Sequence, residues 1–110
     1  MITAIYYRND HRLTIDGHAY HADPGQDIVC AAASILCYTL AASVNNMEAR
    51  GEVRGAVVEV DDEYGSAVVA CSHNEGNEGA VTTAFDTVCT GLKLLAENYP
   101  KNITYKVVQG

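Results

Sequence analysis

The segment Asp27–Ser34 (DIVCAAAS) opens a long run of apolar and small residues, and a short Gly17–Ala19 (GHA) segment precedes it. The run continues to about Asn46, and its apolar residues recur at steps of three and four, which predicts an amphipathic helix. Asp27 stands directly before the run and belongs to a residue type that caps helix N-termini. Cys30 is therefore predicted to lie in the first helical turn.

A cysteine in a first helical turn is chemically different from one in mid-helix. The free backbone N–H groups and the positive end of the helix dipole favour a thiolate there. If Asp23 caps the helix instead, with Pro24 at its first position, Cys30 lies one turn deeper and this effect is weaker. With a histidine nearby to take the thiol proton, the sequence supplies two of the groups that a cysteine protease needs.

Strands are predicted on both sides of this helix. Period-two alternation and flanking turn residues mark five of them, at residues 2–7, 12–18, 57–60, 67–71 and 103–107. A second amphipathic helix is predicted from about Ala80 to Asn98, and Pro100 stops it. The order ββαββαβ predicts an α+β fold in which a mostly antiparallel sheet packs with two amphipathic helices.

Composition and charge narrow the class of protein. A chain of 110 residues, 48% of them hydrophobic, fits one globular domain spanning residues 1–110. No uninterrupted apolar run is long enough to span a bilayer, and Ile2–Tyr7 does not look like a signal peptide, so we expect a cytoplasmic protein. Fourteen acidic against seven basic residues, a net charge of −7, argue against direct nucleic-acid binding. This charge suits a basic peptide partner, although solubility alone also accounts for it.

The four cysteines are interpreted as free thiols. Cys30, Cys37, Cys71 and Cys89 contain no C-x-x-C pair, so the usual zinc pattern is absent. Histidines and cysteines near the first helix are possible zinc ligands, but their spacing is irregular, which argues against a zinc site. We therefore predict no metal and no other cofactor.

The GHA segment, the connector after it and the DIVCAAAS segment resemble the ribosomal-processing cysteine protease (Prp, YsxB-like) family. The resemblance covers essentially the full chain, although only its first third is rich in motifs. It implies that His18 and Cys30 are the catalytic pair. It also selects His18 among four histidines. His11 is expected to be solvated in a turn, whereas periodicity alone does not exclude His21 or His73.

Three further residues are predicted to support the pair. Gly17 lets backbone or substrate come close. Asp27 caps the helix or, as a third triad member, orients His18; the structural role is favoured, because a carboxylate there works against a thiolate. Ser34 lies one turn beyond Cys30 on the same helix face and matches the family motif. Backbone N–H groups at the helix start, including that of Cys30, are predicted to form an oxyanion hole.

The resemblance implies a homodimeric cysteine endopeptidase that removes an N-terminal extension from a large-subunit ribosomal protein. The segment 20–26 would then close over the bound peptide. Three alternatives stay open from the residues alone. They are a phage or prophage relative that processes a phage protein, a non-catalytic ribosome-associated binding module, and a redox-sensing thiol protein.

Overall fold

A computed structural model of the chain describes residues 1–18, 27–61 and 65–109. Its elements follow the order β1 (Ile2–Tyr7), the 3-10 helix η1 (Arg8–Asp10), β2 (Arg12–Asp16), α1 (Ile28–Ala49), β3 (Val53–Asp61), β4 (Ser66–His73), α2 (Glu78–Asn98) and β5 (Ile103–Val108). The predicted order ββαββαβ is confirmed, with one added turn of 3-10 helix between the first two strands.

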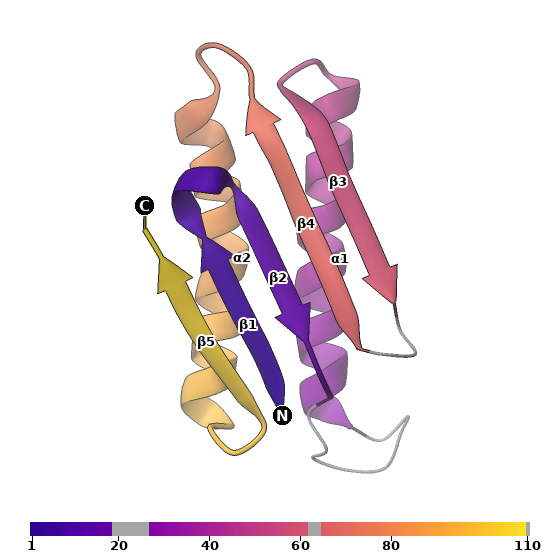
Figure 1. Cartoon of the computed structure of the whole chain (residues 1–110), viewed down its shortest axis with the longest axis vertical. Helices are drawn as coiled ribbons and strands as arrows, with labels where there is room; N and C mark the ends of the chain where they lie inside the picture. The colour runs from indigo at the N-terminus through magenta and orange to yellow at the C-terminus, as the bar shows by residue number, and fades with distance from the viewer. Residues whose placement is uncertain (19–26, 62–64, 110) are drawn as a thin grey trace.

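The strands form one sheet in the order β3-β4-β2-β1-β5 (Figure 1). Neighbours β3–β4, β4–β2 and β2–β1 are antiparallel, whereas β5 lies parallel to β1 at the edge. The sheet is therefore mostly antiparallel, as predicted. The parallel pair arises because α2 carries the chain back along the sheet before β5 begins, a crossover that parallel strands require.

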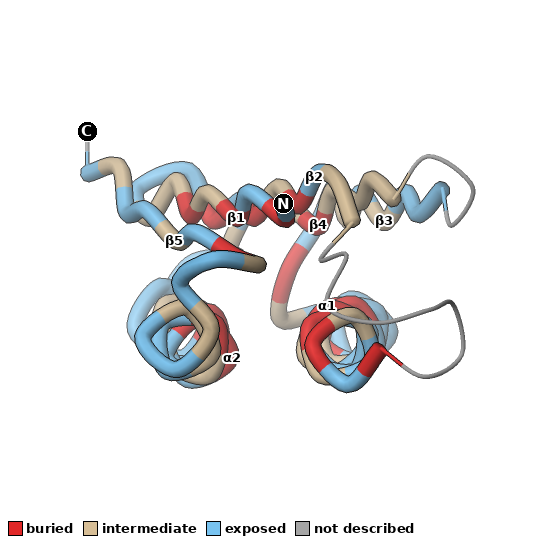
Figure 2. Tube along the Cα trace, turned by 90° about the horizontal axis from the view of Figure 1, so that it is seen from below, coloured by how far each residue is buried: buried red, intermediate tan, exposed pale blue. Residues whose placement is uncertain are grey.

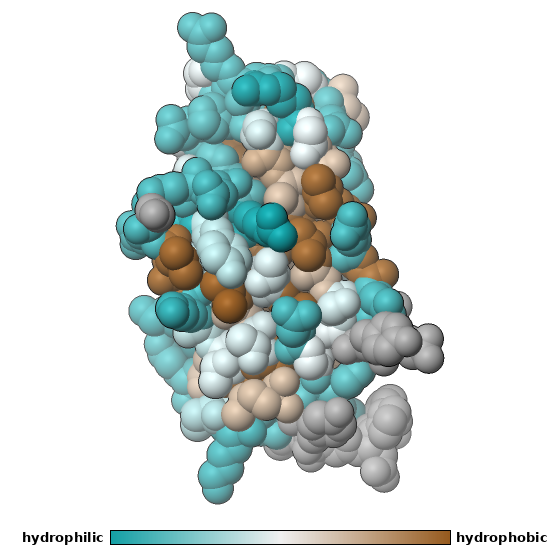
Figure 3. All heavy atoms as spheres, viewed as in Figure 1, coloured by the Kyte–Doolittle hydropathy of each residue, from teal (hydrophilic) through white to brown (hydrophobic). Residues whose placement is uncertain are grey.

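Both helices lie on the same face of the sheet (Figure 2). Alternate residues of the strands point toward them and are buried; Ile2, Ala4 and Tyr6 of β1 are examples, as are Leu13 and Ile15 of β2. The period-two alternation predicted for residues 12–18 is thus observed at Leu13 and Ile15. The opposite face of the sheet, seen in Figure 3, shows hydrophobic residues interspersed with polar ones. The core is therefore a single layer between one side of the sheet and the two helices.

Helix α1 is long and apolar enough to cross a membrane by length and composition alone, although polar residues such as Ser34 and Thr39 interrupt its apolar run. Residues at helical spacing along it, from Val29 through Leu40 to Met47, are buried, and the helix packs on β3, β4 and α2. Packing into the protein core accounts for part of the apolar composition, since 33% of this span is buried. The helix also runs to Ala49, three residues beyond the predicted end.

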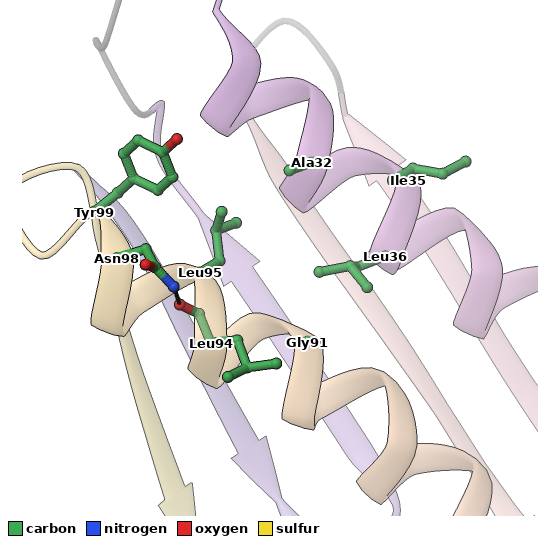
Figure 4. A pocket seen from close by; sticks show the side chains of 8 residues that line it. All are labelled: Ala32, Ile35, Leu36, Gly91, Leu94, Leu95, Asn98 and Tyr99. Carbon is green, nitrogen blue, oxygen red and sulfur yellow. Dashed lines mark hydrogen bonds between the residues drawn. The ribbon is translucent and has the colours of Figure 1, made fainter.

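Helices α1 and α2 pack side by side and leave a shallow, mostly apolar groove between them (Figure 4). A side chain at Gly91 of α2 would come within 2.7 Å of a methyl carbon of Leu36, so glycine allows this close approach. The groove is lined by Ala32, Ile35, Leu36, Gly91, Leu94, Leu95, Asn98 and Tyr99.

Candidate active site

The N-terminus of α1 is capped by Asp27, as predicted. This residue has extended backbone angles, and its Oδ1 accepts hydrogen bonds from the backbone nitrogens of Val29 and Cys30, each at 3.0 Å. Asp27 is buried, which excludes water from competing for these bonds. Cys30 therefore stands in the first turn of α1, and the alternative in which the helix begins at Pro24 does not hold.

The same hydrogen bond corrects the predicted oxyanion hole. The N–H of Cys30 is donated to Asp27 Oδ1, and the N–H of Ala31 is donated to the Asp27 carbonyl oxygen at 3.1 Å. An oxyanion would have to displace the carboxylate to use the N–H of Cys30. A helix N-terminus has free N–H donors, but a capping side chain uses some of them and leaves fewer for a ligand.

His18 lies just beyond the end of β2, and two glycines shape its surroundings. Gly17 has φ +99°, and a Cβ there would stand 2.2 Å from the carbonyl oxygen of Met1. The nitrogen of Met1 in turn donates a hydrogen bond to the His18 carbonyl oxygen. Gly17 thus allows the close approach of the Met1 backbone, while its supporting role for the catalytic pair stays a prediction.

The second glycine, Gly65, was not predicted. Its carbonyl oxygen accepts a hydrogen bond from the nitrogen of Gly17 at 2.8 Å, which ties the end of β2 to the turn before β4. A Cβ at Gly65 would stand 2.9 Å from both Cε1 and Nε2 of His18. The sequence shows a hairpin glycine here, but nothing in the pattern indicates which side chain lies against it.

Cys30 differs from the other three cysteines in exposure. Its side chain is half-buried, whereas Cys37, Cys71 and Cys89 are buried. Burial raises the pKa of Cys37 and Cys71, and it raises the pKa of Cys89 to about 12. These three thiols therefore belong to the core.

Ser34 is exposed on α1, one turn beyond Cys30. No hydrogen bond of its hydroxyl is found within the described part of the chain, so its supporting role stays a prediction. No group of three or more His, Cys, Asp or Glu side chains within residues 1–18, 27–61 and 65–109 has the geometry of a metal site.

Two of the competing histidines lie at the other end of the sheet. His11 follows η1, and His73 ends β4; their rings are in edge-to-face contact at 5.4 Å between centroids. The start of α1, the end of β2 and the start of β4 lie together at the opposite end (Figure 1). His11 and His73 are thus separated from Cys30 by roughly the length of β4, about 23 Å for its eight residues at strand rise. His21 lies outside the described residues.

The expectation that His11 is solvated was wrong. Its side chain is only 4% exposed, and its Nε2 lies 2.8 Å from the hydroxyl oxygen of Thr82 on α2. His11 adopts a left-handed backbone conformation with φ +47°, which turns its ring inward between Phe85 and His73. The polar residues around His11 do not indicate this burial, because it comes from α2, about 70 residues away.

The chain resembles known proteins over nearly its whole length. A family model described as cysteine protease Prp matches residues 1–104. The ribosomal processing protease Prp from S. aureus, solved with a covalently linked product peptide, has a TM-score of 0.77 and 28% identity, covering 98% of this chain and 100% of that chain. The same protease solved with a substrate peptide gives a TM-score of 0.70 at 28% identity, over 98% and 100% of the two chains.

A further solved structure, SMU.848 from Streptococcus mutans, has a TM-score of 0.71 and 28% identity, and covers 99% of this chain and 93% of that chain. No curated protein sequence gives a significant match. The match to the family model, the similarity of fold and the coverage of nearly the whole chain are consistent with one another.

Proposed function

The chain belongs to the cysteine protease Prp family, and from this premise we propose that Cys30 is its nucleophile and His18 its general base. What supports the assignment is a single spatial relationship. Cys30 lies in the first turn of α1, and His18 follows β2 at the same end of the molecule. His11 and His73 lie at the other end (Figure 1). Of the four cysteines, Cys30 is also the one whose sulfur is not sealed in the core.

The reaction then proceeds through a thioester. His18 takes the proton of the Cys30 thiol, and the thiolate attacks the carbonyl carbon of the scissile peptide bond. The C–N bond breaks, and the leaving amine takes the proton back from the His18 imidazolium. Water, deprotonated by His18, hydrolyses the thioester and restores the thiol. The covalently linked product peptide in the S. aureus relative supports a covalent step of this kind.

Asp27 acts in this scheme as a positioning residue. Its carboxylate fixes the first turn of α1 through Val29 and Cys30, and so fixes where the Cys30 sulfur stands. Ser34 supports the site from the next turn of the same helix.

The substrate we propose is the N-terminal extension of a large-subunit ribosomal protein, cleaved in the cytoplasm. The S. aureus relatives are ribosomal processing proteases, and one was solved with a substrate peptide. The net charge of −7 suits a basic segment of the kind that binds ribosomal RNA. We also propose a homodimer, because apolar side chains such as Ile35 and Leu94 remain exposed beside the groove in Figure 4.

The test incubates wild type, Cys30→Ala, His18→Ala and His73→Ala with a ribosomal protein carrying its N-terminal extension, and follows cleavage by mass spectrometry. Cys30→Ala is expected to lose at least about 1,000-fold in rate, and His18→Ala about 100- to 10,000-fold. His73→Ala is the matched control, a histidine at the far end of the sheet, and retains cleavage. Unchanged cleavage by Cys30→Ala would overturn the assignment.

The same experiment separates the substrates. If Cys30 of the wild-type enzyme is readily alkylated but the ribosomal protein stays intact, the substrate is another protein, such as a phage protein. The assignment of the Cys–His pair is then kept. Light scattering of the purified protein tests the dimer: a mass near twice the 11.8 kDa of one chain is expected, and the mass of a single chain contradicts it.

A further inference from the structure

We propose that Gly65 is a positioning residue for the His18 imidazole, and this inference rests on the proposed function of His18. Gly65 ends the turn between β3 and β4, so it is distant in sequence from both His18 and Cys30. Its missing side chain leaves the space in which the imidazole lies.

The geometry of this contact is close. A Cβ on Gly65 would stand 2.6 Å from the carbonyl oxygen of Gly17 and 2.9 Å from both Cε1 and Nε2 of His18. Ordinary contacts between such atoms are about 3.5–4.0 Å, so a side chain at Gly65 forces both the backbone of Gly17, which holds His18, and the His18 ring to shift relative to the turn. The edge of the ring that would meet the new carbon carries Nε2, a nitrogen able to exchange the proton.

Two backbone features hold Gly65 in this place. Its φ of +67° belongs to the left-handed region, which glycine adopts without strain. Its carbonyl oxygen accepts the hydrogen bond from the nitrogen of Gly17, the residue before His18. The turn therefore fixes the backbone beside His18 and bounds its ring at the same time, and a shift of the turn reaches the imidazole directly.

The chain offers a matched control for substitution at Gly65. Gly55 lies in β3 of the same hairpin with a φ of +60°, and a Cβ there would meet nothing within 4 Å. Gly55→Ala therefore adds a similar backbone strain without touching His18. A difference between the two alanine variants reports the contacts of the new methyl group rather than the cost of a left-handed alanine.

The experiment measures the rate of alkylation of Cys30 by iodoacetamide at pH 6.5, resolved by peptide mass spectrometry, together with kcat and KM for cleavage. Gly65→Ala is expected to lower the alkylation rate and kcat by about 10- to 100-fold with KM within about threefold, because a misplaced base loses alignment. Gly55→Ala is expected to stay within about twofold of wild type.

The decisive step repeats Gly65→Ala in the His18→Ala background. With no imidazole to displace, the substitution is expected to change the alkylation rate by less than about twofold. An equal loss in both backgrounds, or wild-type rates in a folded Gly65→Ala protein, would overturn the inference. If the proposed function itself is wrong, the result is different: His18→Ala alone then leaves alkylation and cleavage unchanged.

A measurement on the wild-type protein covers the case in which Gly65→Ala does not fold. The Hε1 proton of His18 and the Hα protons of Gly65 are close enough for a nuclear Overhauser effect in solution. Observation of this cross-peak supports the contact. Its absence, with both resonances assigned, would refute it.

Discussion

The carboxylate of Asp27 accepts a hydrogen bond from the backbone nitrogen of Cys30 at 3.0 Å, so one side chain both caps α1 and occupies the N–H next to the Cys30 sulfur. Capping stabilises the helix and fixes the sulfur. The same negative charge opposes a thiolate one turn into the helix and fills a place that an oxyanion would need. These effects have opposite consequences for activity, and substitutions at Asp27 can separate them.

Asp27→Ala is expected to lower the free energy of unfolding by about 1–2 kcal/mol, because the nitrogens of Val29 and Cys30 lose their partner. Asp27→Asn keeps an oxygen acceptor, so its free energy of unfolding is expected to fall by only a few tenths of the loss in Asp27→Ala. Urea denaturation measures both. If Asp27 only caps the helix, Asp27→Asn keeps its kcat; a large fall in kcat with stability retained would assign it the orienting role toward His18.

His11 is expected to make the protein less stable in mild acid. Burial, followed by the nearby His73, holds the pKa of His11 below its usual value of about 6.5. The unfolded chain therefore binds more protons than the folded one as pH falls below about 6.5, and stability is lost through that range and down through the folded pKa. The other charged groups around the ring are Arg8 of η1 and Glu78 and Asp86 of α2.

Unfolding by urea at pH 7.5, 6.5 and 5.5 measures this slope. His11→Asn is the comparison, because asparagine tolerates the left-handed backbone at this position. The variant is expected to be less stable at pH 7.5 but to show a shallower loss toward pH 5.5. An identical slope in both proteins would show that other groups cause the acid sensitivity.

Asp86 is expected to matter more for stability than its exposed partner Arg8. The hydroxyl of Tyr6, a residue only 2% exposed, donates to Asp86 Oδ1 at 2.8 Å, and Arg8 donates to both carboxylate oxygens. Asp86→Ala strands the buried hydroxyl at a cost of about 1–3 kcal/mol. Arg8→Ala removes a solvent-exposed ion pair and should cost less.

A double substitution checks this explanation. Removing the Tyr6 hydroxyl with Tyr6→Phe in the Asp86→Ala protein is expected to recover part of the lost stability, since no polar group is then left unpaired. Additive losses in urea denaturation would contradict it. The hydrogen bond from Arg8 also holds the pKa of Asp86 below its usual value, so this part of the stability is present above about pH 4 and is lost as pH falls further.

Alkylation is expected to be selective for Cys30 in the folded protein. The other three thiols are buried, and burial raises the pKa of each, that of Cys89 to about 12. Brief treatment with iodoacetamide at pH 7.5 should therefore add one label, at Cys30, whereas treatment in concentrated urea should add four. Labelling of Cys37 as fast as Cys30 in the folded state would contradict the packing of α1.

Much of the fold was predictable because its causes are local. The spacing of apolar residues marked both long helices, alternation marked Leu13 and Ile15 as core residues, and Asp27 marked the start of α1. The turn at Asp61–Gly65 marked the hairpin. The ends of α1 and β3 were placed less well, because the last turn of a helix and the first residues of a strand depend on what packs against them.

The site was predictable to the extent that it follows from residue types at short spacing. Asp27 and Cys30 are three residues apart, so the helix itself determines that the cap reaches the nitrogen beside the sulfur. What the cap consumes was not foreseen, nor was the burial of His11, because Thr82 and Phe85 reach it from α2.

By itself, the sequence determined the elements and their order, since periodicity and capping act over a few residues, and its resemblance to a family indicated His18 and Cys30 as the candidate pair. Only the tertiary structure decided which histidines lie at the start of α1 and which lie at the far end. It also placed Gly65 against the His18 ring, nearly fifty positions along the chain. Such neighbours are set by strand pairing between distant segments, and their free energy comes from contacts that no local pattern encodes.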